Sequence, residues 1–336
     1  MSRSQDSIST RPRVLALSGG IGGAKLALGL YRILEPWQLA VVVNTGDDFE
    51  HLGLHISPDV DTLMYTLSGE NNTELGWGRA GETWVFLEQL KRLGGETWFQ
   101  LGDGDLAVHI RRTESLKQDH TLSAITADLF LRMGIEAHAW PMSDQSVRTM
   151  VDTADGQVLP FQNYFVGQLC KPEVSGFRFT GAQTAKPNQS FLRLLGDPKL
   201  DAVIICPSNP FVSVDPILAI PGVREALKAC PVPVIAISPI VGGEAVKGPT
   251  AKMMRELKMD VNPLSVAGHY AGLLDGFVLD DADAGYRDSL EISSLVTSTV
   301  MQTLADRDTL ARDVLAFAEQ LKAKELSLPV VARGAL

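Results

Sequence analysis

The hydrophobic positions of this chain predict a parallel β-sheet with helices on both faces. Uninterrupted apolar runs stand at residues 14–17, 39–43 and 202–206, and a fourth strand is predicted over 234–238, which is apolar up to Ser238. Runs without polar alternation are typical of strands that are covered on both sides. Each run stops at a loop of glycine, proline or short polar residues, and the first loop leads into helical spacing over 24–34. The pattern therefore predicts an α/β fold, a Rossmann-like, doubly wound and mostly parallel sheet.

A different pattern lies between the second and third of these runs. Three helices are predicted there, at 82–93, 105–117 and 121–133. Residues 137–180 instead alternate around Asp155-Gly156, which is a β-hairpin signal. We assign residues 82–180 to an inserted helical and β-hairpin lobe, and residues 1–81 and 181–336 to the Rossmann-like core.

The charge and composition of the chain disfavour some classes of binding partner. The net charge is -10 and no basic run occurs, so a nucleic-acid partner is disfavoured. Cys170, Cys206 and Cys230 are far apart and form no CxxC pair, which favours reduced thiols in the cytoplasm. Residues 1–13 are polar and do not resemble a secretory signal, and no apolar run approaches the ~20 residues that span a bilayer. We expect a cytoplasmic protein that binds neither nucleic acid nor membrane.

A glycine loop, Ser18-Gly19-Gly20-Ile21-Gly22-Gly23, follows the first predicted strand. The GxGxxG pattern would need glycine at Lys25, and a Walker loop would need serine or threonine at Leu26, so neither template fits. Backbone N–H groups at the start of a helix still suit an anion. We expect a phosphate or substrate to be bound by Gly20, Gly22, Gly23 and Lys25. The alternative is close packing of the helix on the strand.

Carboxylates gather after the second predicted strand, at the edge where doubly wound folds bind ligands. The loop Asn44-Thr45-Gly46-Asp47-Asp48 supplies Asn44, Thr45 and Asp47 as candidate substrate-binding residues. Asp48 and Asp61 offer oxygen ligands from two segments, as a hard cation such as Mg²⁺ prefers. The alternative is a helix start: Asp59 follows Pro58 as a potential N-cap, and Asp61 then only steadies that start. Spacing alone does not decide between the two interpretations.

Histidines in this region have a simpler interpretation. His51 and His55 are four residues apart, but Gly53 and Pro58 disfavour a helix between them. We therefore expect hydrogen-bonded loop histidines rather than a metal-binding helix face.

Other short polar segments are predicted near the same edge. Ser208 and Asn209 follow the third strand, and Gly242 and Gly243 follow the fourth, where they could recognise a base, ribose or diphosphate. Ordinary turn chemistry is the alternative. His109 and Arg112 are three residues apart and can share one helix face as ligand-binding cations.

Six stretches combine these features in order along the chain. They are SGGIGGAKLALGL (18–30), VVVNTGDDFEHLGLHISPDVDTLMYTLSG (41–69), GWGRAGETW (76–84), LGDGDLAVHIRRT (101–113), CPSNPFVSVDPIL (206–218) and SPIVGGEAVKGPTAKMM (238–254). Together they resemble the 2-phospho-L-lactate transferases (CofD type) of coenzyme F-420 biosynthesis. The combination is far more specific than a glycine loop alone.

The resemblance implies a phosphotransferase. Its acceptor would be Fo, the deazaflavin 7,8-didemethyl-8-hydroxy-5-deazariboflavin, and its donor a GDP-type conjugate of phospholactate, phosphoenolpyruvate or phosphoglycerate. GMP would leave, giving F-420-0 or its dehydro form, with Mg²⁺ as cofactor. In this picture Asp48 and Asp61 are catalytic metal ligands, assisted by Asp47 or Asp59, in a homodimer. On that basis Asp61→Asn would lower turnover by about two orders of magnitude. If Asp61 only supports the helix start, the same substitution would leave turnover nearly unchanged, because asparagine also caps helices well.

A related branch, resembling gluconeogenesis-factor proteins, shares the glycine loop and the nucleotide edge. It implies a non-enzymatic regulator that binds a nucleotide or nucleotide sugar. The runs NTGDD…SPDVDT and GWG…ETW favour the transferase branch. The sequence does not specify the donor acid, because the three acids differ only by a methyl, a methylene or a hydroxymethyl group.

Overall fold

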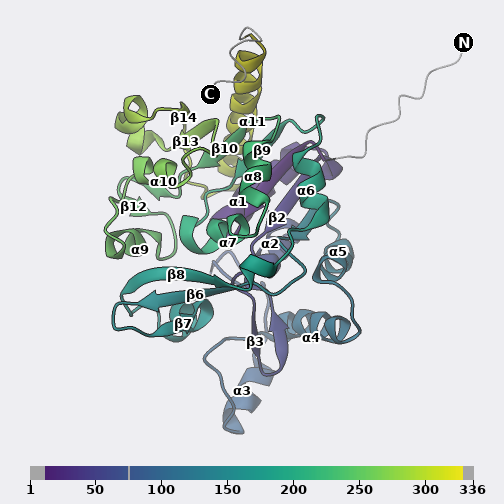
Figure 1. Ribbon diagram of the computed structural model, residues 1–336. Helices are drawn as coiled ribbons and strands as arrows, with labels where there is room; N and C mark the ends of the chain where they lie inside the picture. Colours follow the sequence, from purple (N-terminus) through teal and green to yellow (C-terminus); the bar gives the residue numbers. More distant parts are fainter. Residues whose placement is uncertain (1–11, 75, 328–336) are drawn as a thin grey trace, which may run out of the picture.

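The computed structural model describes residues 12–74 and 76–327. Its centre is a sheet of seven strands in the spatial order β14-β13-β10-β9-β1-β2-β5, and every neighbouring pair is parallel (Figure 1). The strands are β1 Val14–Ser18, β2 Leu39–Val43, β5 His138–Pro141, β9 Ala202–Ile205, β10 Val234–Ile237, β13 Gly276–Leu279 and β14 Ser293–Val296. The strand order reverses between β1 and β9. The predicted Rossmann-like, doubly wound sheet is confirmed.

Helices cover both faces of the sheet, and each face has its own core. One face carries α1 Gly20–Ile33, α2 Pro58–Ser68, α5 Leu122–Arg132 and α11 Leu304–Ser327. The other carries α6 Gln189–Leu195, α7 Asp215–Leu218, α8 Val223–Lys228, α9 Thr250–Glu256 and α10 Pro263–His269. Along β1, Val14 and Ala16 join the first core, and Leu15 and Leu17 join the second. This two-sided burial explains the uninterrupted apolar runs in the sequence.

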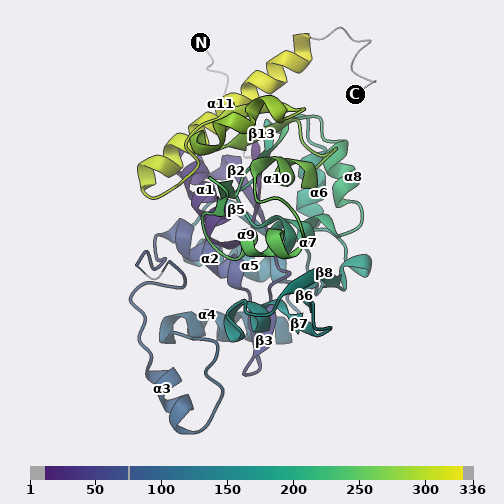
Figure 2. The same ribbon diagram turned by 90° about the vertical axis from the view of Figure 1, so that its left-hand side faces the viewer.

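The remaining strands and α-helices lie beyond the carboxyl edge of the sheet (Figure 1). They are the hairpin β3 Phe49–His51 and β4 Leu54–Ile56, the sheet of β6 Arg148–Thr153, β7 Val158–Pro160 and β8 Val174–Thr180, the helices α3 Val85–Arg92 and α4 Asp103–Lys117, and the pair β11 Ile240–Val241 and β12 Glu244–Ala245. Figures 1 and 2 show α3 at the far end of an arm that projects from the body. No residue of α3 is buried.

The division of the chain into a core and a lobe over 82–180 stays a prediction, and the structure shows which elements that segment contains. Its three helices and the hairpin of β6 and β7 around Asp155-Gly156 are present. However, β5 lies inside this segment and pairs with β2, and α5 covers the central sheet. The sheet therefore takes its edge strand from the segment assigned to the insertion. β5 alternates between partly buried and buried positions, so it lacks the continuous apolar run that marks the inner strands.

Two expectations from composition concern the described residues. Cys170, Cys206 and Cys230 are free thiols, as their spacing predicted. Of the helices in the described part of the chain, none is both long enough and apolar enough to span a membrane. The prediction about a secretory signal falls on residues 1–13, of which 1–11 lie outside the described residues.

Candidate active site

The loops that follow β1 and β9 contact each other where the strand order reverses. The Ser208 hydroxyl donates to the Gly19 carbonyl at 2.8 Å and accepts from the Gly19 N–H at 3.3 Å. A Cβ placed on Gly22 would lie 2.3 Å from the Pro207 carbonyl oxygen. In open α/β sheets the ligand crevice forms outside the carboxyl ends of the strands at this reversal. The expected ligand edge is therefore built from residues that are far apart in the sequence, since 189 positions separate Gly19 from Ser208.

Each glycine of the loop has a local reason to be glycine. Gly20 has a φ of +63°, in the left-handed region. A Cβ on Gly23 would lie 2.7 Å from the Ser208 hydroxyl, and one on Gly19 would lie 2.6 Å from Ser213 Cβ. Close packing at Gly19, Gly22 and Gly23 and the left-handed backbone at Gly20 thus account for the glycines without a ligand. Anion binding by Gly20, Gly22 and Gly23 stays a prediction.

Gly22→Ala should destabilise the fold by ~1–3 kcal/mol, because the new methyl group meets a backbone carbonyl that cannot rotate away. Gly268, near the end of α10, is a matched control, since a Cβ there meets nothing within 4 Å. Gly268→Ala should be neutral or stabilise by up to ~1 kcal/mol. Urea unfolding of the two variants measures both effects. Equal stabilities would show that the contact between α1 and the β9 loop is not tight.

Asp59 ties three elements together at this edge. One carboxylate oxygen accepts the Gly20 N–H at 2.8 Å, and the other accepts the Asn44 amide at 2.9 Å. The Asn44 amide also donates to the Val212 carbonyl at 3.1 Å, and its oxygen accepts the Gly46 N–H at 2.8 Å. Burial raises the pKa of Asp59 to about 6, against the lowering effect of these hydrogen bonds. The N-cap of α2 is Ser57, so Asp59 connects α2 to α1 and β2 rather than capping α2.

Asp47 and Asp48 are buried in the turn after β2. One oxygen of Asp48 accepts the Ser57 hydroxyl at 2.9 Å and lies 3.0 Å from His55 Nε2. The Oδ1 atoms of Asp47 and Asp48 have no hydrogen-bond partner within the described part of the chain. Burial, followed by the negative charge of Asp59, raises the pKa of Asp47 well above its usual range. Buried carboxylate oxygens without donors suit a cation.

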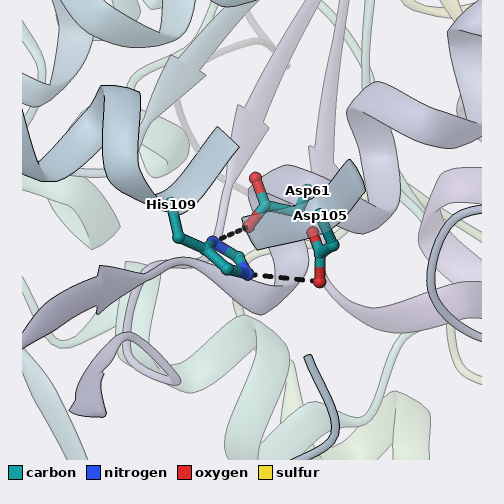
Figure 3. A group of neighbouring side chains, drawn as sticks. All are labelled: Asp61, Asp105 and His109. Atoms are coloured by element: carbon teal, nitrogen blue, oxygen red, sulfur yellow. Dashed lines mark ion pairs between the residues drawn. The ribbon is translucent and has the colours of Figure 1, made fainter. Parts of the chain in front are cut away.

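Asp61 instead belongs to a buried ion-pair network. Arg112 is fully buried and donates to both oxygens of Asp61, one of them at 3.1 Å. His109 lies between Asp61 and Asp105, with Nδ1 3.6 Å from Asp61 and Nε2 3.1 Å from Asp105 (Figure 3). The Tyr65 hydroxyl donates to the other Asp105 oxygen at 2.6 Å. The network joins α2 to α4.

This arrangement differs from the expected pairing of Asp48 with Asp61 around a metal. Asp61, Asp105 and His109 do offer ligand atoms within 4.8 Å of one another. The Arg112 guanidinium, however, already supplies positive charge to both Asp61 oxygens. Burial raises the pKa of Asp61, and the charges of Arg112 and His109 oppose that effect. His109 and Arg112 were expected to face a ligand, yet both are buried against Asp61.

The other predicted residues are distributed along the same edge with their own partners. Lys25 donates to the Met301 carbonyl at 2.7 Å, and burial lowers its pKa. The Asn209 side chain accepts the Phe211 N–H at 3.0 Å, as turn chemistry predicts. The Gly242 N–H donates to Asp283 at 3.0 Å and is no longer free for a ligand. Gly243 adopts a φ of +79°.

Sequence reasoning did not assign Tyr65, Asp105 or Ser57 to the site. Asp105 was noted only as part of the run before His109. Their spacing to Asp48 and Asp61 carries no local signal, because the contacts join α2, α4 and the turn after β2 through space. From sequence alone, a tyrosine near the end of an apolar helix is interpreted as a residue of the hydrophobic core, because the partner of its hydroxyl group is not known.

Comparison with known proteins decides the family. The family model described as 2-phospho-L-lactate transferase CofD matches residues 14–320. This chain belongs to that family. A phosphoenolpyruvate transferase of Streptomyces griseus is 40% identical over 93% of this chain and 100% of its own length. A 2-phospho-L-lactate transferase of Methanocaldococcus jannaschii is 36% identical over 92% of this chain and 99% of its own length. The chain is thus a member of a transferase family.

Among solved structures, a UPF0052 family protein of Bacillus halodurans has a similar fold. The TM-score is 0.61 with 16% sequence identity, over 91% of this chain and 99% of that protein. At this identity the likeness concerns the fold alone.

Proposed function

We propose that this chain transfers a phospho-carboxylic acid from a GDP-type donor to Fo, with release of GMP. The observation that carries the proposal is a pair of buried oxygens, one from Asp47 and one from Asp48, that have no partner among the described residues and lie in the turn after β2 of a CofD-family chain. Carboxylates held in this way at the carboxyl edge of the sheet, one strand from the strand-order reversal, suit a diphosphate with its divalent cation. The product is F-420-0 or its dehydro form, depending on the acid.

In this reaction the ribityl hydroxyl oxygen of Fo bonds to the distal phosphorus. The bond from that phosphorus to the GMP oxygen breaks, GMP leaves, and the hydroxyl proton passes to a base. The chain's own part is to hold the donor and acceptor in line at the carboxyl edge. The N–H groups of Gly22 and Gly23 at the start of α1 would face the diphosphate.

Mg²⁺ is the cofactor we propose for this site. Asp48 would hold it, with Asp47 and Asp59 contributing negative charge nearby, and the ion would neutralise the charge on the diphosphate and on the departing GMP. These residues fit a cation, since burial, and then the negative charge of neighbouring carboxylates, raises the pKa values of Asp47 and Asp59. Asp61 would join the ion only if it released a bond to Arg112.

The donor acid stays open within the proposal, since relatives named for phosphoenolpyruvate and for 2-phospho-L-lactate have similar identity to this chain. We further propose a cytoplasmic homodimer that acts on small molecules. The second candidate is a regulator that binds a nucleotide or nucleotide sugar without turnover. The shared glycine loop favours it, whereas the names of the relatives favour the transferase.

Incubation with Fo, Mg²⁺ and each of the three GDP-type donors tests the proposal. We expect a new phosphodiester of Fo by mass spectrometry and an equal amount of GMP by chromatography. A chelator in excess over Mg²⁺ should abolish both products, and added Mg²⁺ should restore them. Tight guanine-nucleotide binding with no product from any donor would support the regulator instead. Competition of the three donors in one reaction identifies the preferred acid.

A further inference from the structure

Arg148, at the start of β6, lies against the turn that follows β2. The neighbouring Thr149 N–H donates to the Gly46 carbonyl at 2.8 Å and fixes β6 on that turn. Arg148 Nη1 donates to the Thr45 carbonyl at 3.4 Å and to the Val147 carbonyl at 2.9 Å. The guanidinium is therefore held at the same turn that carries Asp47 and Asp48.

Arg148 is partly buried, yet in the described part of the chain no carboxylate pairs with it. Its Nε and Nη2 groups have no hydrogen-bond acceptor there either. Two other arginines that are withdrawn from the surface do have an acidic partner, since Arg112 pairs with Asp61 and Arg79 pairs with Glu70. The unpaired nitrogens of Arg148 are not among the buried side-chain atoms that lack a partner, so they are accessible to a ligand, and the planar fork of a guanidinium matches a carboxylate. The charge of Arg148 therefore fits an anionic group of a ligand.

A second unsatisfied group lies at the same turn. The Thr149 hydroxyl is buried, with 2% of the residue exposed, and has no hydrogen-bond partner among the described residues. It would lie 2.5 Å from a Cβ placed on Gly46, so it points at the turn between Thr45 and Asp47. Buried hydroxyl groups nearly always have a partner. An oxygen-bearing ligand at this turn would supply one.

We propose that Arg148 binds the carboxylate of the donor's acid, with the Thr149 hydroxyl as a neighbouring donor. This inference rests on the proposed function and adds a specificity-determining residue to it. The three candidate acids share a carboxylate and differ elsewhere, so Arg148 recognises what they have in common. The buried acidic groups of Asp47, Asp48 and Asp59 would repel that carboxylate without a cation beside it. Arg148 thus selects acid-bearing donors from other GDP derivatives.

The test compares two donors that differ only in the carboxylate. One is the GDP conjugate of L-lactate, and the other is the β-ethyl ester of GDP, which keeps the diphosphate but has no acid. Wild type should prefer the lactate donor in kcat/KM with Fo and Mg²⁺. Arg148→Gln should reduce that preference by about 10–100-fold, the scale of a hydrogen bond to a charged group, and should leave the ethyl ester nearly unchanged. Arg148→Lys should recover part of the preference, since it keeps the charge without the fork.

Arg178 on β8 provides the control, because it pairs with Asp152 at 2.6 Å on the surface of the same small sheet. Arg178→Gln should keep the wild-type preference. If Arg148→Gln lowers kcat/KM equally for both donors, Arg148 only supports the turn and the inference is overturned. If wild type turns over both donors equally well, it is overturned as well.

Failure of the proposed function has a different signature, since wild type would then form no product from either donor. Calorimetric Kd values for the same two compounds then replace kcat/KM. Tighter binding of the lactate conjugate by wild type, lost in Arg148→Gln, would support carboxylate recognition without transfer. Equal Kd values in wild type would overturn it.

Discussion

Asp48→Asn should lower Mg²⁺-dependent turnover by about two orders of magnitude or more and leave the chain folded. Asparagine keeps an oxygen that can accept the Ser57 hydroxyl, so the local structure survives. What it removes is the negative charge of a buried carboxylate whose second oxygen has no partner in the described residues. Loss of one key electrostatic group in a water-excluded site typically costs a factor of ~10²–10³ in rate. The measurement is kcat over a Mg²⁺ titration.

Two further measurements separate this loss from misfolding. The thermal unfolding midpoint of Asp48→Asn should match that of wild type, and the concentration of Mg²⁺ needed for half-maximal binding should rise. Asp260→Asn is the matched control, since Asp260 is exposed and lies outside the site. The control should keep wild-type turnover. Full turnover of Asp48→Asn at limiting Mg²⁺ would exclude Asp48 as the residue that holds the ion.

Asp61→Asn should destabilise the fold by ~3–5 kcal/mol, because it leaves the Arg112 guanidinium buried without a counter-charge. This expectation differs from the one that the sequence alone supports, in which Asp61→Asn mainly removes a metal ligand. The two pictures are separable by denaturant unfolding in the presence of a chelator. A loss of stability without any metal points to the ion pair, since a metal ligand contributes nothing under that condition.

A double substitution completes this test. Asp61→Leu with Arg112→Met removes both charges together and should recover most of the stability that either single substitution loses. The ion-pair interpretation would be wrong if Asp61→Asn had the same stability as wild type in the presence of chelator but no longer bound Mg²⁺. Asp61 would then be a metal ligand, as first expected, and Arg112 a weak partner.

The inner strands were predictable from sequence because a strand that is buried on both faces has a continuous run of apolar residues. Residues 14–17 and 39–43 are continuous apolar runs, and they form β1 and β2 in the centre of the sheet. The glycine loop and the turn 44–48 follow those strands directly, so their place at the carboxyl edge also followed from the chain order. The sequence signal of the edge strand β5 is weaker, because only alternate positions along this strand are buried.

The partners of the site residues were decided by tertiary structure. Asp59 looked like a helix cap next to Pro58, yet it bonds Gly20 and Asn44 from other elements. Asp61 looked like a free ligand, yet a guanidinium 51 residues away takes both of its oxygens. Hydrophobic periodicity is a property of neighbouring residues, so the sequence itself determines it. Which charge a buried carboxylate meets depends on how α2, α4 and the turn after β2 pack, and only the folded chain determines that.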